Sequence, residues 1–245
     1  MCRATESSIK SSRTAMAVNN IAVSLIVRGW YKEAVEILTT NLTLQKSIKV
    51  IGGSSFSAQV FQAASVLHSE LATKGDHPCK TICLKVVEGT DLQAILNASS
   101  NIASPTWIPS PIRLSESFFM ESHKMSILAA VSLNNLGLAN LCLAKVCREG
   151  ADGVFLKAAG KSFQNCEVLC NSLAGHSQAG IELTYFTSFL WMMTLGNLRI
   201  IYQKRSLPFM AMEMQQLVHR RSVQLERDGF TSLVMGQPES AAAAA

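Results

Sequence analysis

Residues 17–42 read AVNNIAVSLIVRGWYKEAVEILTTNL, and the spacing of their apolar side chains decides the fold class. On both sides of Gly29 these side chains recur three or four positions apart, as on one face of a helix; they are Ile21, Leu25, Tyr31, Ala34, Val35, Leu38 and Leu42. Glycine often closes a helix because it adopts the left-handed backbone conformation without steric cost. The stretch therefore predicts two amphipathic helices joined by a tight turn.

A second stretch, residues 132–170, repeats this pattern as SLNNLGLANLCLAKVCREGADGVFLKAAGKSFQNCEVLC. Its NNLG matches the earlier NNIA, so that Gly137 corresponds to Ala22. The later part of the match pairs Ala159, Phe163 and Cys166 with Ala34, Leu38 and Asn41. A third, fainter copy is formed by Met192, Leu195, Gly196, Ala211, Gln215 and Val218. Repeated helix pairs indicate an all-α architecture.

These copies resemble the tetratricopeptide repeat, in which large-x2-Leu-Gly/Ala-x2-large is followed by Ala-x3-Phe-x2-small. The runs SPIRLSES, SLNNLGLANL and FLKAAGKSFQNCEVL are also similar to uncharacterised tetratricopeptide-like proteins of unicellular algae. The resemblance implies antiparallel helix pairs that stack on their neighbours. It further implies that Ala22, Gly137 and Gly196 lie where the two helices of a pair meet, because larger side chains would keep the axes apart.

The spacing of the copies departs from a regular array. The small residue and the alanine are separated by 12 positions in the first copy (22 to 34), 22 in the second (137 to 159) and 15 in the third (196 to 211). The second pair therefore has extra residues around 148–153, and the copies begin much farther apart than the roughly 34 residues of a tandem array. An α-α superhelix and a compact bundle both remain open.

We expect one helical domain over residues 14–229, between a flexible tail at 1–13 and a second tail at 230–245. Its helix pairs are predicted at 14–42, 117–173 and 179–228, with a long irregular insertion at 43–116. Within the insertion, the spacing of Phe56, Val60, Ala64 and Leu67 predicts a helix. The β-branched run 81–87 predicts a short strand, which Trp107 and Ile108 are expected to join in a small β-ribbon.

Composition excludes some classes of protein. Hydrophobic residues make up 48% of the chain and charged residues only 16%, so the chain has ample apolar surface for a core and is not disordered. The net charge of +5 is spread out, unlike the clustered charge of a nucleic-acid-binding protein. Seven cysteines without framework spacing indicate reduced thiols in an intracellular compartment, cytoplasmic or organellar.

The segment GVFLKAAGKS, residues 153–162, ends like a phosphate-binding loop. Such a loop needs glycine, four residues and then Gly-Lys-Ser or Gly-Lys-Thr, so the first glycine would have to stand at Phe155. The apolar residues Phe155, Ala159, Phe163, Cys166 and Cys170 instead step along one helical face. We therefore predict a helix here and no nucleotide site.

No other pattern predicts chemistry strongly. Cys142, Cys147, Cys166 and Cys170 are close enough on two paired helices to hold zinc, but buried cysteine also serves as a small apolar residue. The five histidines are scattered singly, without a partnering nucleophile or acid. We expect no catalytic residue, metal or cofactor.

Partner binding is the function that the sequence favours. In the tetratricopeptide family the inward face of the first helix often contacts a peptide, and here it carries Asn19, Val23, Asn134, Leu138 and Asn197. An asparagine amide can both donate to and accept from a peptide backbone; alternatively, these asparagines bond only between neighbouring helices. Met210, Met212 and Met214 form either an apolar contact patch or part of the core.

We therefore expect a non-catalytic protein–protein interaction scaffold or a subunit of a larger complex. Its partner would be another protein or peptide, not nucleic acid. The alternative is a membrane-associated assembly factor that uses the apolar segment 181–201, which is long enough to span a bilayer.

Overall fold

The computed structural model describes residues 2–48, 87–88, 109–115, 124–147, 152–174 and 181–227. Their helices are α1 (Cys2–Val27), α2 (Tyr31–Ile48), α5 (Lys124–Val146), α6 (Asp152–Ala174), α7 (Ile181–Lys204) and α8 (Pro208–Arg227). Two short strands, β1 (Val87–Glu88) and β2 (Ile112–Arg113), pair in parallel. The prediction of an all-α fold is confirmed for this part of the chain.

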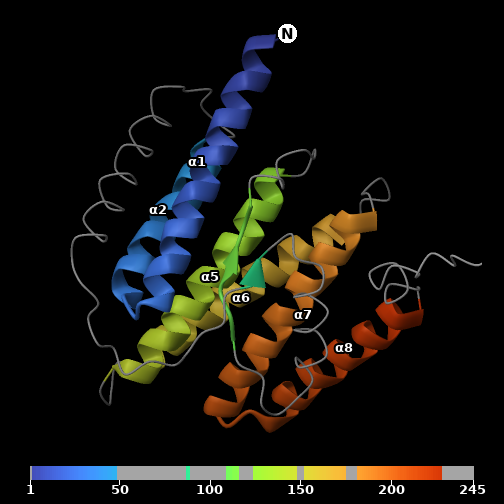
Figure 1. Cartoon of the computed structure of the whole chain (residues 1–245). Coiled ribbons are helices and arrows are strands. Elements are labelled where there is room, and N and C mark those ends of the chain that lie inside the picture. The colour runs from blue at the N-terminus through green and yellow to red at the C-terminus, as the bar shows by residue number, and fades with distance from the viewer. Residues whose placement is uncertain are drawn as a thin grey trace, which may run out of the picture.

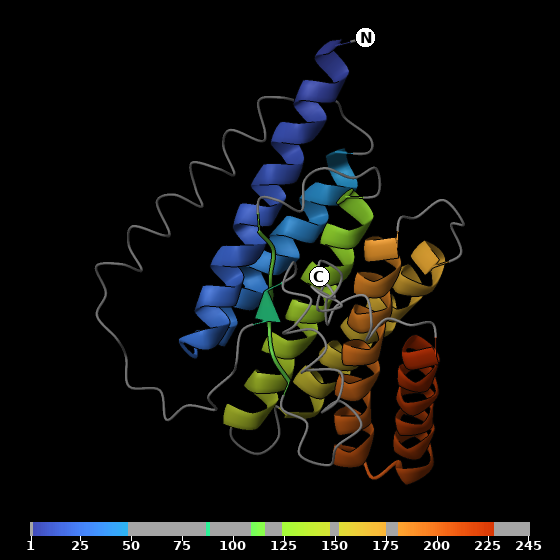
Figure 2. The same cartoon turned by 45° about the vertical axis from the view of Figure 1, so that its right-hand side comes forward.

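The helices pack as a series of neighbours. Each described helix lies against the next one along the chain, and the first helices of adjacent pairs also touch, α1 against α5 and α5 against α7. Figure 1 shows the pairs side by side, from α1–α2 in blue to α7–α8 in orange and red, and Figure 2 shows the same order after rotation. Helix α5 is the central element, since it contacts α1, α2, α6, α7 and β2.

Several element boundaries differ from the sequence-based expectation. Helix α1 begins at Cys2, so residues 2–13 are helical rather than a tail, and α2 continues to Ile48. The expected ribbon is not confirmed: β1 shares only Val87 with the expected strand, and its partner is β2. Most of the insertion, including the expected helix at 56–67, and the tail at 230–245 lie outside the described residues.

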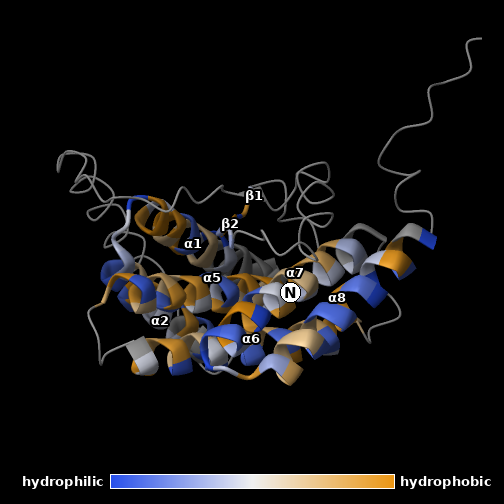
Figure 3. Ribbon diagram, turned by 90° about the horizontal axis from the view of Figure 1, so that it is seen from below, coloured by the Kyte–Doolittle hydropathy of each residue, from blue (hydrophilic) through white to orange (hydrophobic). Residues whose placement is uncertain are grey.

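Burial explains why α5 is so apolar. Nearly all of its side chains between Ile127 and Leu143 are buried, because neighbouring helices cover it on several sides. In Figure 3 α5 is largely orange, while α8, which packs mainly on α7 at the edge of the stack, carries many blue residues. The contrast in hydropathy between α5 and α8 therefore reflects how many neighbours cover each of these two helices.

Two turns close their helices in the same way. At the end of α1, Trp30 N–H donates to the Leu25 carbonyl (2.9 Å) and Gly29 N–H to the Ile26 carbonyl (3.1 Å), with Gly29 at a φ of 82°. This pair of bonds is a Schellman motif, and the predicted role of Gly29 is confirmed. The end of α7 repeats the two bonds, but with Ser206 at a φ of 56°.

Gly137 of α5 lies close to Phe163 of the paired helix α6. A Cβ atom on Gly137 would lie 2.6 Å from a ring carbon of Phe163, whose side chain is fully buried. The repeat pattern predicted a small residue at this helix–helix contact, and the geometry confirms it for Gly137. The positions matched in the first two copies are also buried: Ala22, Ala34, Leu38, Asn41, Ala159, Phe163 and Cys166.

We predict that Gly137→Ala lowers the free energy of unfolding by about 1–3 kcal/mol, because overpacking outweighs the gain of roughly 1 kcal/mol in helix propensity. The matched control is Gly160→Ala in α6, whose added Cβ would meet only Ile201 at 4.0 Å. That variant should be more stable than the wild type. Urea denaturation measures both, and a stabilised Gly137→Ala protein would contradict the close approach.

A second prediction concerns Ser206, which has a backbone conformation that L-residues adopt reluctantly. Ser206→Gly should raise the free energy of unfolding by about 0.5–1 kcal/mol, because glycine removes that steric cost. Gln216→Gly on the exposed face of α8 should instead destabilise by about 1 kcal/mol. Equal losses in the two variants, measured by urea denaturation, would rule out the strain at Ser206.

Candidate functional site

An extended segment of the chain, residues 109–115, lies against α1 and α5; we call it the strap. Two prolines, Pro109 and Pro111, favour an extended backbone because proline restricts both itself and the residue before it. Ile112 and Leu114 are fully buried, while Arg113 between them is only partly buried and donates from Nη2 to Ser24 Oγ (3.1 Å). The strap therefore fills a groove between α1 and α5 with two alternate side chains.

Two asparagine side chains hold the strap by its backbone. Asn135 Nδ2 donates to the Ile112 carbonyl (2.8 Å), and Ile112 N–H donates to Asn135 Oδ1 (2.9 Å). Asn20 forms the same pair of bonds with Leu114, two residues farther along the strap. Its Nδ2 donates to the Leu114 carbonyl (2.7 Å), and Leu114 N–H donates to its Oδ1 (3.0 Å). A primary amide has a donor and an acceptor side by side, as this double pairing requires. We call Asn20 and Asn135 the asparagine clamp.

The five residues expected to meet a partner are all buried in this structure: Asn19, Val23, Asn134, Leu138 and Asn197. Asn19 supports the clamp, because it accepts from Asn135 Nδ2 (3.0 Å) and donates to the Ile112 carbonyl (3.2 Å). Asn197 Nδ2 donates to Asn134 Oδ1 (3.4 Å), which joins α7 to α5. Asn134 and Asn197 therefore bond between helices, and Asn19 bonds both to α5 and to the chain's own strap, while contact of these residues with a partner stays a prediction.

Asn20 and Asn135 were not among the residues predicted from the sequence, although a pattern in the sequence marks them. Asparagine occurs as a doublet at the same position of two copies, Asn19-Asn20 and Asn134-Asn135. Neighbouring helical residues point about 100° apart, so that one member of a doublet can face an adjacent helix while the other faces the groove. The sequence does not specify which asparagine of each doublet bonds to the strap.

The segment 153–162 is helical, as predicted, and lies within α6. Ser162 Oγ donates to the Ala158 carbonyl of its own helix (3.0 Å), and Lys161 is exposed. Ala159 and Phe163 are fully buried. The Gly-Lys-Ser sequence here is therefore part of a packed helix.

Cys142, Cys147, Cys166 and Cys170 have free thiols, and the first, third and fourth are buried. Within the described ranges, no three histidine, cysteine or acidic side chains gather closely enough to hold a metal ion. Cys166 Sγ donates to the Ala130 carbonyl (3.1 Å). Burial raises the pKa of the Cys142 thiol to about 11, against the smaller opposing effects of Lys145 and a hydrogen bond with Tyr31.

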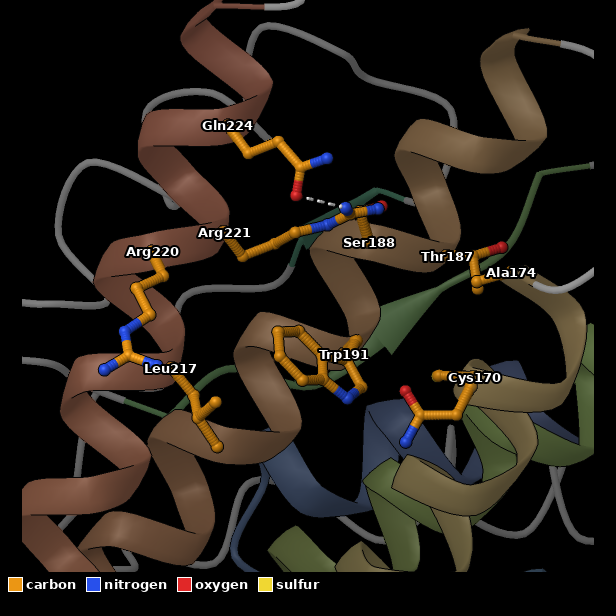
Figure 4. Close-up of a pocket in the computed structure, with 10 residues that line it drawn as sticks. Cys170, Ala174, Thr187, Ser188, Trp191, Leu217, Arg220, Arg221 and Gln224 are labelled. Carbon is orange, nitrogen blue, oxygen red and sulfur yellow. Dashed lines mark hydrogen bonds between the residues drawn. The ribbon is translucent and has the colours of Figure 1, made fainter.

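A cavity of about 300 Å³ lies between α6, α7 and α8 (Figure 4). Its lining is Cys170, Asn171, Ala174, Thr187, Ser188, Trp191, Leu217, Arg220, Arg221 and Gln224. Arg221 is held in place, because its Nη2 donates to Ser188 Oγ (2.6 Å) and its Nη1 to Gln224 Oε1 (2.9 Å). Among the described residues, the lining contains two cations, Arg220 and Arg221, and no carboxylate.

Apolar side chains are exposed at the start of α8. Phe209 is 80% and Met212 53% exposed, and Leu207 and Met210 accompany them. Met214 is buried in the core. The three methionines therefore divide between the surface and the core.

One described helix, α5, is long and apolar enough to cross a membrane by length and composition alone, at Met125–Val146. Of its most apolar window, 83% is buried among the other helices. The segment 181–201, which the sequence suggested as a span, does not meet the same criterion, and most of its described residues are buried in α7.

Alkaline pH should destabilise the protein through Cys142. Its thiol ionises near pH 9 when unfolded and near pH 11 when folded, so its stabilisation is complete below pH 9 and is lost as the pH rises to about 11. The difference amounts to roughly 2–3 kcal/mol. Cys142→Ala should flatten the fall in unfolding free energy over this range, whereas the cavity control Leu141→Ala should keep the wild-type slope. Identical slopes for Cys142→Ala and the wild type would contradict the raised pKa.

The asparagine clamp and the cavity that contains Arg220 and Arg221 are thus two distinct features, one between α1 and α5 and the other between α6, α7 and α8. No family model, curated protein or solved structure matches this chain.

Proposed function

We propose that this chain is a non-catalytic protein–protein interaction scaffold of the tetratricopeptide type, whose groove between α1 and α5 binds an extended polypeptide segment. In the structure the chain's own strap occupies this groove, and a partner segment takes its place by exchange. The observation that carries the proposal is the asparagine clamp, because it pairs with the N–H and carbonyl groups of two residues of an extended chain.

Two features support the tetratricopeptide type. Each helix pair packs chiefly on its neighbours, which is the contact pattern of stacked repeats. The small residue at Gly137 also lets α5 approach Phe163 of its paired helix, as the repeat consensus requires. The irregular spacing of the copies is accommodated by helices of 23 residues in the second pair.

The clamp recognises backbone, which makes exchange chemically reasonable. Its four hydrogen bonds involve no strap side chain, so another extended segment can form the same bonds. Selectivity then comes from the positions of Ile112 and Leu114, where buried aliphatic side chains contribute about 1.5–3 kcal/mol each. A preferred partner segment therefore has an extended backbone and aliphatic residues two positions apart.

The tethered strap competes strongly with any partner. A covalently linked segment has an effective concentration on the order of millimolar when its connection is short and flexible, and a free peptide must exceed it. The affinity for a partner then depends on the stability of the strap's contacts with α1 and α5. Substitutions that weaken these contacts without altering α1 or α5 should allow a free peptide to bind.

The test uses the full chain with Ile112→Ala and Leu114→Ala, a strap-weakened variant, and a fluorescein-labelled peptide of residues 108–117. Fluorescence anisotropy should show at least about 10-fold tighter peptide binding to this variant than to the wild type, because each lost aliphatic contact weakens the internal competitor. Adding Asn135→Ala should abolish the gain. Adding Asn140→Ala instead should leave the gain in affinity unchanged, since among the described residues Asn140 donates to the Leu136 carbonyl of its own helix (2.9 Å) and not to the strap.

Circular dichroism and size exclusion establish that each variant is folded. Two results would refute the groove as a polypeptide site: a folded strap-weakened variant that does not bind the peptide, or one that binds equally well a peptide with Ile112 and Leu114 replaced by serine.

The alternative function is that of a membrane-associated assembly factor that uses residues 181–201. Carbonate extraction distinguishes it from the scaffold, because such a factor would stay in the membrane pellet.

A further inference from the structure

Arg113, between the two buried aliphatic residues of the strap, also contacts α1. Side chains alternate along an extended chain, so the side chain at position 113 starts from the opposite face to Ile112 and Leu114. Its Nη2 nevertheless donates to Ser24 Oγ of α1 (3.1 Å), and the side chain is partly buried. This contact requires a long side chain with a donor near its end. Position 113 is therefore a third point at which the groove selects a partner segment.

Ser24 is arranged to accept a hydrogen bond from that position. It lies one helical turn after the clamp residue Asn20, and residues four positions apart share one face of a helix. The Ser24 hydroxyl donates its own proton to the Asn20 carbonyl (3.2 Å), so that its oxygen has only lone pairs left for the strap. A donor at position 113 matches this oxygen, whereas a carboxylate does not.

The end of α1 favours a positively charged donor over a neutral one. Ser24 lies in the last turn of α1, where the backbone carbonyl groups carry partial negative charge, and that turn contains no basic residue. Arg28 follows the helix but is exposed, where solvent and salt screen its charge. A charged donor also forms a stronger hydrogen bond than a neutral donor does. The groove therefore prefers arginine or lysine to glutamine at position 113.

Arg113 does not use every donor of its guanidinium. Its Nε is buried and has no hydrogen-bond partner among the described residues. Lysine lacks this group but keeps the positive charge at the end of a long aliphatic stem. We therefore expect the groove to accept lysine at this position about as well as arginine.

We propose that the partner segment of the strap groove has a basic residue between its two aliphatic residues. The groove then recognises the pattern aliphatic–basic–aliphatic in an extended polypeptide. The asparagine clamp binds the backbone, the groove buries the two outer side chains, and Ser24 at the end of α1 binds the central one. This inference rests on the proposed exchange at the strap, and it specifies which polypeptides the groove selects.

The test uses the fluorescein-labelled peptide of residues 108–117 and its Arg113→Lys, Arg113→Gln and Arg113→Glu variants. The protein is the full chain with Ile112→Ala, Arg113→Gln and Leu114→Ala, so that its own strap lacks the contact with Ser24. In fluorescence anisotropy the Arg113→Lys peptide should bind within about 3-fold of the native peptide. Arg113→Gln should raise the Kd about 5- to 10-fold and Arg113→Glu more than about 10-fold, because the charge-assisted bond is lost.

Two controls separate this contact from a general effect of charge. A peptide with Arg113 and Ser117 exchanged keeps the composition and net charge, and it should bind as weakly as the Arg113→Gln peptide. Adding Ser24→Ala to the protein should raise the Kd of the native peptide about 5- to 10-fold and change that of the Arg113→Gln peptide less than about 2-fold. The matched control is Ser162→Ala, which should alter neither Kd. Ser162 Oγ also donates to the carbonyl four positions earlier, but within α6.

The outcomes distinguish this inference from the proposed function. If no peptide binds to a variant that circular dichroism shows to be folded, the groove is refuted as a polypeptide site, and this inference with it. If the native and Arg113→Gln peptides bind equally well, or if Ser24→Ala weakens both equally, only the central basic residue is refuted.

If the triple variant does not fold, Arg113→Gln alone in the full chain takes its place. The native peptide should bind to this variant about 5- to 10-fold more tightly than to the wild type, because the tethered strap has lost its bond to Ser24. Equal Kd values for the variant and the wild type would overturn the inference.

Discussion

The close approach of Gly137 to Phe163 fixes the centre of this protein. Because no side chain separates them at that point, α5 and α6 pack tightly, and the Phe163 ring is enclosed in the core. Helix α5 in turn contacts α1, α2, α7 and β2. The first helix pair and the strap thus pack on α5, whereas the third pair packs mainly on α6 and touches α5 through α7.

Polar side chains on α5 give this apolar helix its specificity. Asn134 bonds with Asn197 of α7, whereas its neighbour Asn135 bonds with Asn19 of α1 and with the strap. An unsatisfied buried amide group costs about 1–3 kcal/mol. Asn135 has partners for both its Nδ2 and its Oδ1, whereas among the described residues only the Oδ1 of Asn134 has one. The contacts of Asn135 therefore favour the arrangement of α1, α5 and the strap in which they are made.

The strap groove and the arginine-containing cavity are two separate features of one scaffold. The groove contains neutral amides that bond to the backbone of the strap, and the cavity is lined by two arginines. They use different helices, α1 and α5 for the groove and α6, α7 and α8 for the cavity. Stacked helix pairs permit this separation, since each pair contacts mainly its neighbours.

Local patterns in the sequence determined the helices, the turn at Gly29, the helical state of residues 153–162 and the small residue at Gly137. Each depends on residues close together in the chain, on helical period or on the backbone freedom of glycine. The start of α1 at Cys2 was missed because the polar residues before Thr14 give no strong apolar period. Only the tertiary structure decided that the strap lies in the groove, that Asn20 and Asn135 hold it, and that Trp191 shares a cavity with Arg221. Those contacts join residues 23 to 116 positions apart or bring together three helices. No periodic pattern along a chain specifies which of several buried amides will meet a distant backbone.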